Sequence, residues 1–384
     1  MARGAPIGQT DGELTEEQRA AVPSAPGTAG GHTEEMPRVR LTRRGVWASV
    51  AFVVSAVAFL YFVLPKLLGL RDTWNRIQHG NGLWLGLGAV LEVCSFGGYV
   101  VLFRGVFVRG ASRIGWRASY EITMAGLAAT RLFASAGAGG VALTAWALRR
   151  AGMEPRLVGC RLVAFMALLY GVFMACLVLG GIGLYLGILP GQHPFAITIV
   201  PAIFGATVIA IFLAVALLPS DLHRLMRRWD PGSRAGRAAR RLAAIPAATS
   251  SGVRTAIELV RGRDGSLLGG LGWWGFDISV LWACFHAFGG APPVAVIVMS
   301  YFVGMLGNVL PLPGGIGGVD GAMIGAFSAF GVAPSLAVVS VLAYRALAFW
   351  LPTVPGAVAY LQLRRTVQRW RAERRASEQA PSYT

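Results

Sequence analysis

The sequence predicts an all-α polytopic membrane protein with six transmembrane spans and two opposed re-entrant helical hairpins that form an inverted repeat. The first observation is composition: of the 384 residues 55% are hydrophobic and 14% are charged, against roughly 45–50% and about 25% in soluble domains. The second is that long apolar runs alternate with clusters of arginine, which carry the formal net charge of +17. The third is that glycine interrupts two of these runs near their middle. Arginine clusters between apolar runs indicate membrane topology rather than nucleic-acid binding.

The chain begins with a polar segment before its first apolar run. Residues 1–37 are rich in Ala, Gly, Pro, Thr and Glu and are predicted to be a disordered cytoplasmic tail. The transmembrane domain is predicted over 38–365, with its first span at 46–66. That run is too long and starts too late for a cleavable signal peptide. Residues 366–384 are predicted to be a second cytoplasmic tail.

The remaining full spans follow from length. A hydrocarbon core about 30 Å thick requires about 20 apolar helical residues. Five further runs satisfy this requirement and bring the predicted total to six. They lie at 83–103, 159–188, 195–218, 267–288 and 336–361.

Two other apolar regions are each divided by a glycine-rich break. Region 119–148 is broken at 134–140, and region 294–330 is broken at 311–318. Each half has about 12 to 18 residues, which is too short to cross a bilayer comfortably. We therefore predict two re-entrant helical hairpins.

The arginine clusters set the orientation. They lie before the first span, after the second span, after the first hairpin, in the loop 219–266 and after the last span. If both hairpins return to their side of entry, every cluster faces the cytoplasm, and the opposite face receives only Lys66, Arg71 and Arg76. A full crossing by either hairpin would remove this bias. The expected location is the plasma membrane, with both termini cytoplasmic.

The two breaks share a short sequence. Residues 137–141 (Gly-Ala-Gly-Gly-Val) match residues 315–319 (Gly-Ile-Gly-Gly-Val) at an offset of 178. Inverted repeats with broken helices hold the substrate near mid-membrane in many secondary transporters, since non-helical backbone is tolerated there only inside protein or beside a cavity. The alternative is that these glycines only allow close helix packing.

Charged residues within the apolar runs are candidate functional groups, because a charge at mid-membrane is costly. Arg131 and Arg345 offer planar guanidinium groups that match phosphate oxygens. The alternative is internal pairing, of Arg345 with Asp320 or Asp277, and of Arg131 with Glu92 or Glu121. The acids predicted to pair with charges or exchange protons are Glu92, Glu121 and Asp277.

The second break also carries a recognisable motif. The stretch from Asn308 to Gly321, Asn-Val-Leu-Pro-Leu-Pro-Gly-Gly-Ile-Gly-Gly-Val-Asp-Gly, resembles the signature of the lysylphosphatidylglycerol synthase transmembrane, or flippase-like, family. The resemblance covers about residues 40–365 and is supported by Tyr344 and Arg345 followed by a tryptophan, leucine and proline. It implies an integral membrane protein that acts on lipids, in some members by translocating aminoacylated phosphatidylglycerol and in others by handling lipid-linked carriers. The acid of the motif is Asp320, where the family more often has Glu, and no aminoacyltransferase domain is expected.

These observations together predict a translocase for an anionic phospholipid, a glycolipid or a polyprenyl-phosphate-linked carrier. The alternatives left open are a membrane-embedded enzyme that modifies lipid headgroups and an accessory subunit of a membrane glycosyltransferase. No catalytic residues, metal site or cofactor are predicted; the expected partner is a membrane lipid, with no nucleic acid, and a homo-oligomer or a glycosyltransferase partner is left open. The predicted substrate-binding residues are Arg131, Gly137, Gly139, Gly140, Asn308, Pro311, Pro313, Gly314, Gly315, Gly317, Gly318, Asp320 and Arg345.

Overall fold

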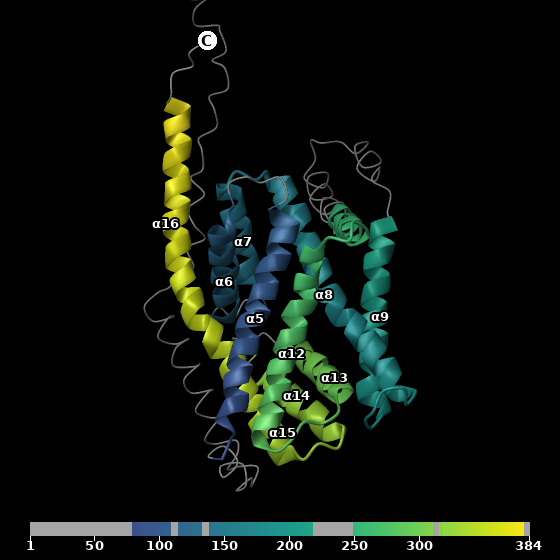
Figure 1. The fold of residues 1–384 in the computed structure, drawn as a ribbon. Helices are drawn as coiled ribbons and strands as arrows, with labels where there is room; N and C mark the ends of the chain where they lie inside the picture. The colour runs from purple at the N-terminus through teal and green to yellow at the C-terminus, as the bar shows by residue number, and fades with distance from the viewer. Residues whose placement is uncertain are drawn as a thin grey trace, which may run out of the picture. The chain divides into compact units, whose positions relative to one another are not determined.

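The computed structural model describes most of the apolar part of the chain, and every regular element in it is helical (Figure 1). The described residues belong to the unit Arg40–Thr384, and the ranges are 79–108, 114–132, 138–217, 249–309, 315 and 317–379. The predicted tail 1–37 and first span 46–66 lie outside them. The named helices are α5 (Gly82–Phe107), α6 (Trp116–Leu132), α7 (Ala138–Arg150), α8 (Pro155–Tyr185), α9 (Phe195–Leu217), η2 (Gly265–Leu267), α12 (Leu268–Phe288), α13 (Val294–Met305), η3 (Leu306–Val309), α14 (Gly318–Ala329), α15 (Pro334–Arg345), η5 (Ala346–Trp350) and α16 (Leu351–Gln379).

Five helical segments in the described part of the chain are long and apolar enough to cross a membrane. They are Gly82–Phe107, Pro155–Tyr185, Phe195–Leu217, Gly265–Phe288 and Pro334–Glu373. Each corresponds to one of the spans predicted from the sequence after the first. Large apolar side chains remain exposed on them, for example Leu217 at 82%, as expected of surfaces that contact lipid. The chain is therefore a multi-pass membrane protein.

The central pair of helices is α5 and α12, which lie side by side and antiparallel (Figure 1). The backbone amide of Asn81 donates to the carbonyl of Ala287 at one end, and the hydroxyl of Ser95 donates to the carbonyl of Trp273, 2.9 Å away, near the middle. A Cβ at Gly98 would lie only 2.9 Å from the carbonyl oxygen of Gly269. Small residues at this crossing let the two backbones approach closely.

Helix boundaries recur along the chain at a nearly constant spacing. α13 begins at Val294, 178 residues after the start of α6 at Trp116. α15 begins at Pro334, 179 residues after the start of α8 at Pro155. Ser95 and Trp273, which meet across the central pair, are also 178 residues apart. The offset found in the glycine motif therefore extends to whole helices.

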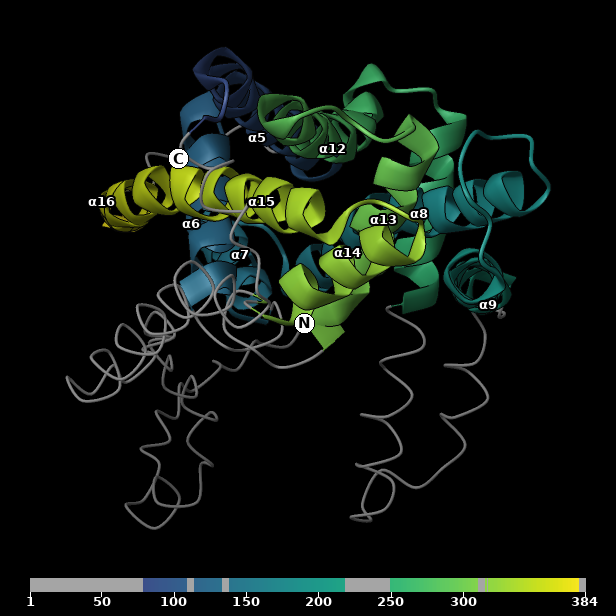
Figure 2. The same cartoon turned by 90° about the horizontal axis from the view of Figure 1, so that it is seen from below.

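The last predicted span is one helical segment with a wide turn inside it. η5 is a π-helical turn between α15 and α16, and it immediately follows Arg345. Pro352, two residues after η5, has no amide hydrogen to donate to the carbonyl four residues earlier, and its ring would collide with that carbonyl in a regular α-helix. π-Turns of this kind often occur at functional sites. Figure 2 shows α15 between α12 and α14, both of which it contacts.

Two segments that are predicted to be cytoplasmic are partly helical in the structure. Residues 249–261, within the predicted basic loop 219–266, are helical, while residues 218–248 lie outside the described part. α16 continues to Gln379 and so includes the first part of the predicted C-terminal tail 366–384.

Candidate functional site

The second predicted hairpin consists of α13, the short turn η3 and α14. α13 and α14 have 12 residues each, about half of what a full span needs, and they pack against each other. A Cβ at Gly307 would lie 2.5 Å from the carbonyl oxygen of Gly318. The hairpin therefore closes through backbone contact, which only a glycine at this position permits.

The turn that leads into α14 depends on glycine and on Asp320. Gly315 and Gly317 have φ angles of +67° and +85°, in the region that glycine adopts without steric cost. The amide of Gly317 donates to Oδ2 of Asp320 at 2.8 Å, so the carboxylate caps the start of the helix, where the helix dipole also favours negative charge. Pro311, Pro313 and Gly314, also predicted to bind substrate, lie outside the described residues.

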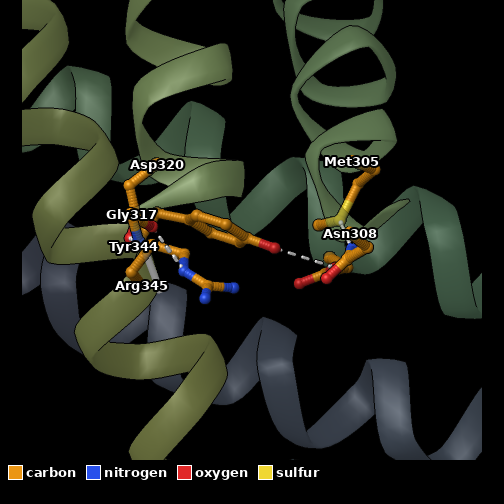
Figure 3. Close-up of polar contacts among 7 residues, drawn as sticks. Met305, Asn308, Gly317, Asp320, Tyr344 and Arg345 are labelled. Carbon is orange, nitrogen blue, oxygen red and sulfur yellow. Dashed lines mark hydrogen bonds and ion pairs between the residues drawn. The ribbon is translucent and has the colours of Figure 1, made fainter. Parts of the chain in front are cut away.

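Arg345 forms an ion pair with the same carboxyl group. Its Nε lies 2.7 Å from Oδ1 of Asp320, and the two side chains are 15% and 2% exposed. Figure 3 shows the two residues together, with the guanidinium extending in this view toward Asn308. Asp320 is one of the two acids considered as partners for Arg345, and the structure pairs it with Arg345. The hairpin turn and the last span are thus joined by one charged pair.

Asn308 occupies the opposite side of the view in Figure 3. Its side chain is exposed, and its amide lies 3.6 Å from the sulfur of Met305. A Cβ at Gly315 would lie 2.5 Å from Oδ1 of Asn308. Asn308 therefore packs directly against the hairpin turn.

A second polar group is centred on Asp277, which is 6% exposed on α12. Its Oδ2 accepts a hydrogen bond from the hydroxyl of Tyr344 on α15 at 3.1 Å and another from the hydroxyl of Tyr301 on α13. Sequence reasoning missed both tyrosines as site residues. The available signal was that a buried tyrosine hydroxyl usually needs a partner, and an acid in the same apolar environment is such a partner.

Glu92 adds a third buried acid from α5. It is 1% exposed and interacts electrostatically with Cys284 on α12 and Tyr344 on α15. The described site therefore contains three carboxyl groups and one arginine, contributed by α5, α12, α14 and α15. We call Glu92, Asp277, Asp320 and Arg345, with Tyr301 and Tyr344, the polar cluster. In the described residues, no group of three or more His, Cys, Asp or Glu is arranged to hold a metal ion.

The first predicted hairpin corresponds to α6 and α7, which also pack together. A Cβ at Gly140 would lie 2.2 Å from Oγ1 of Thr130 and 2.5 Å from the carbonyl oxygen of Gly126. Gly140 therefore supports the close-packing alternative for this motif. Gly139, the second residue of α7, is half-buried, whereas Gly137 and the side chain of Arg131 lie outside what the structure describes.

Glu121 on α6 has partners outside the polar cluster. It is fully buried, with Oε1 3.0 Å from Nε of Arg117 and Oε2 accepting from the hydroxyl of Thr366 at 2.6 Å. Thr366 belongs to α16, so Glu121 connects the first hairpin to the helix that follows Arg345.

We expect Thr366→Val to weaken this connection, because it removes a hydrogen bond to a buried carboxylate that is worth about 1.5–3 kcal/mol. Thermal unfolding in detergent should show a lower Tm for this variant. The matched control is Thr207→Val on α9, whose hydroxyl is exposed and bonds only within its own helix, to Ile203. Equal Tm values for the two variants would contradict the assigned role of Thr366.

Comparisons with known proteins give a consistent result. Residues 46–356 match the model of the family described as the lysylphosphatidylglycerol synthase TM region. A UPF0104 membrane protein of Methanothermobacter thermautotrophicus is 25% identical over 327 residues, which are 81% of this chain and 94% of that relative.

Two shorter matches have higher identity. A UPF0104 membrane protein of Methanothermobacter thermautotrophicus is 33% identical over 90 residues, 23% of this chain and 26% of the relative. One of Methanocaldococcus jannaschii is 35% identical over 95 residues, 24% of this chain and 28% of the relative. These two matches span only about a quarter of the relatives they cover.

Proposed function

The chain belongs to the family described as the lysylphosphatidylglycerol synthase TM region, and from this membership we propose that it moves a lipid with a phosphate headgroup between the leaflets of the plasma membrane. The substrate class is an anionic phospholipid, a glycolipid or a polyprenyl-phosphate-linked carrier. The observation that carries the proposal is the ion pair of Arg345 with Asp320 at the turn of the second hairpin.

The proposed topology has six spans, two re-entrant hairpins and both termini in the cytoplasm. Its support is the short length of α13 and α14 and the antiparallel central pair of α5 and α12. The repeated spacing of helix starts adds to this, because two related units whose first helices pair in opposite directions form an inverted repeat. Such a repeat offers a broken helix to each face of the membrane.

Arg345 is the group that we propose binds the phosphate. Its guanidinium has five N–H donors in a planar fork, and its side chain is partly exposed whereas its partner Asp320 is buried. A phosphate can form two parallel hydrogen bonds with such a fork. The lipid headgroup would then compete with Asp320 for Arg345.

This competition connects binding with movement. Asp320 also accepts the amide of Gly317, so it holds the hairpin turn and Arg345 at once. When a phosphate takes Arg345, the turn loses its tie to α15. The second hairpin then has one fewer constraint, and the lipid shifts the balance between its conformations because it binds one of them better.

Vesicles reconstituted with the purified protein test the proposal. They contain fluorescent phosphatidylglycerol in both leaflets, and a membrane-impermeant reductant quenches the outer leaflet. Protein-free vesicles should lose about half of the signal, and vesicles with the protein should lose nearly all of it. Loss of only half in both samples, repeated with a labelled polyprenyl phosphate, would contradict the proposal. A chemically altered lipid in the same vesicles would instead favour the headgroup-modifying enzyme.

A further inference from the structure

Among the residues that the structure describes, the polar cluster contains more carboxyl groups than guanidinium groups. Its described members include the carboxyl groups of Glu92, Asp277 and Asp320, all 6% exposed or less, and one guanidinium, that of Arg345. If a phosphate takes Arg345, another negative charge enters a region that already holds three acids. Buried charge of one sign is costly unless it is paired or neutralised. Binding an anionic lipid therefore calls for a compensating positive charge.

Asp277 is placed to receive that charge as a proton. Two tyrosine hydroxyls donate to one oxygen of its carboxyl group, from α13 and from α15. α13 belongs to the second hairpin, and α15 carries Arg345. The protonation state of Asp277 therefore acts on the two elements that the lipid is proposed to separate, because hydrogen bonds to a carboxylate are stronger than those to its neutral form.

A separate observation concerns two hydroxyls near these tyrosines. Ser300 and Ser340 are fully buried, and their Oγ atoms make no hydrogen bond within the described part of the chain. Ser340 lies four residues before Tyr344 on α15, so the two side chains share one face of that helix. Buried polar atoms without a partner often interact with water. Such a water beside Tyr344 would give a proton a path to Asp277.

We propose that lipid translocation is coupled to protons, and that Asp277 is the residue that binds the proton as Arg345 binds the phosphate. This inference rests on the proposed function. One proton from water on the acidic side joins a carboxylate oxygen of Asp277 when the lipid loads. The same proton leaves to water on the other side when the lipid is released, so the lipid and the proton move in the same direction.

Ionisable and charged side chains face Asp277 from the helices packed around it. α5 contributes Glu92, α13 contributes Tyr301, and α15 contributes Tyr344 and Arg345. On α12 itself, Cys284 lies two turns away and interacts with Glu92, and His286 stacks on Trp84 at the end of the helix. On α8, Tyr170 is near Trp274, with ring centroids 6.5 Å apart.

Vesicles with a pH gradient test the coupling. They contain fluorescent phosphatidylglycerol, and potassium with valinomycin holds the membrane potential at zero. The wild-type protein should enrich the label in the leaflet on the alkaline side, by up to about 10-fold for one pH unit if one proton accompanies each lipid. A protonophore should abolish the enrichment.

Asp277→Asn is the key variant, because asparagine keeps an oxygen acceptor for both tyrosines and removes the ionisable group. Its leaflet ratio should fall to about 1 at any pH gradient. The matched control is Asp264→Asn, at the start of η2, where an amide oxygen can still cap Ser266. The control should enrich the label as the wild type does.

A second variant keeps the test decisive if Asp277→Asn does not exchange lipid. Tyr344→Phe removes one donor to the carboxylate and so favours the protonated form. The pH midpoint of exchange should rise by about one unit, and an unchanged midpoint would overturn the inference.

The outcomes separate the two proposals. Exchange by the wild type without any response to the gradient, or full enrichment by Asp277→Asn, overturns the coupling and leaves the proposed function intact. Preferential movement of an amine-bearing phospholipid over phosphatidylglycerol, without a response to the pH gradient, also overturns the proton coupling. The carboxyl groups of the polar cluster would then bind the amine. No exchange of any lipid by the wild type overturns the proposed function itself.

Discussion

Replacing Arg345 with alanine is expected to reduce lipid exchange by about 10- to 150-fold, because hydrogen bonds to a charged group are worth about 1.5–3 kcal/mol and the guanidinium is the proposed phosphate ligand. Arg345→Lys should retain part of the activity, since lysine keeps the charge but not the planar fork. Exchange of fluorescent phosphatidylglycerol in vesicles measures both. Arg375→Ala, at an exposed position on α16, is the control and should exchange lipid at the wild-type rate.

The same substitution also affects stability, and this effect can be separated from binding. Arg345→Ala leaves Asp320, 2% exposed, without its cationic partner. Removing one member of a buried pair costs about 3–5 kcal/mol. The double variant Arg345→Ala with Asp320→Asn removes the buried charge and should recover much of the Tm in detergent, but none of the exchange activity. Wild-type exchange by a folded Arg345→Ala protein would refute the role given to Arg345.

The sequence was sufficient to locate five helices that are long and apolar enough to cross a membrane, and it reduced the candidate partners of Arg345 to two acids. Length and hydropathy place these five helices at the predicted positions, because a bilayer imposes a minimum length on any apolar helix that spans it. Pairing of Arg345 with Asp320 was one of two alternatives, and sequence had no means of choosing between Asp320 and Asp277. α15 contacts both α12, which carries Asp277, and α14, which carries Asp320, so the pairing depends on side-chain placement between segments that are distant in sequence.

Other features required three-dimensional information. The two tyrosines on Asp277 are separated from it by 24 and 67 residues, so no local pattern connects them. Glu121 was predicted as a candidate partner for Arg131, but its described partners are Arg117 and Thr366. The role of Gly140 was ambiguous in sequence, because sequence alone does not distinguish a glycine at a packed helix crossing from a glycine beside a substrate.

The repeated spacing of the helices does not extend to the charged residues of the site. At the offset of 178, Asp320 corresponds to Ala142, and Arg345 corresponds to Ala167. The charged pair is therefore present only in the second half of the repeat. Because the pair is present in one half only, we infer different tasks for the two hairpins: the second holds Asp320, the partner of Arg345. The first, packed through Gly140 and joined to α16 by Glu121, supports the helix that follows Arg345.

Gly307→Ala is expected to disrupt the second hairpin and, with it, both stability and exchange. The added Cβ would lie 2.5 Å from the carbonyl oxygen of Gly318, 2.7 Å from its carbonyl carbon and 2.9 Å from the amide nitrogen of Val319. All three are backbone atoms, which cannot rotate away as a side chain can, so η3 and α14 must separate. Overpacking of this kind costs about 1–3 kcal/mol, occasionally more. The separation would also displace Asp320 at the start of α14, and so move it away from Arg345.

Gly325→Ala provides the control within the same hairpin. A Cβ at Gly325 would meet nothing within 4 Å, and alanine is favoured over glycine in a helix by up to about 1 kcal/mol. This variant should therefore keep or slightly raise the Tm and should exchange lipid normally, while Gly307→Ala should lower the Tm and lose exchange. If Gly307→Ala unfolds with the wild-type Tm and exchanges lipid at the wild-type rate, close contact at the hairpin does not position Asp320. If it keeps the Tm but loses exchange, the contact serves the geometry of the Arg345 pair rather than the stability of the fold.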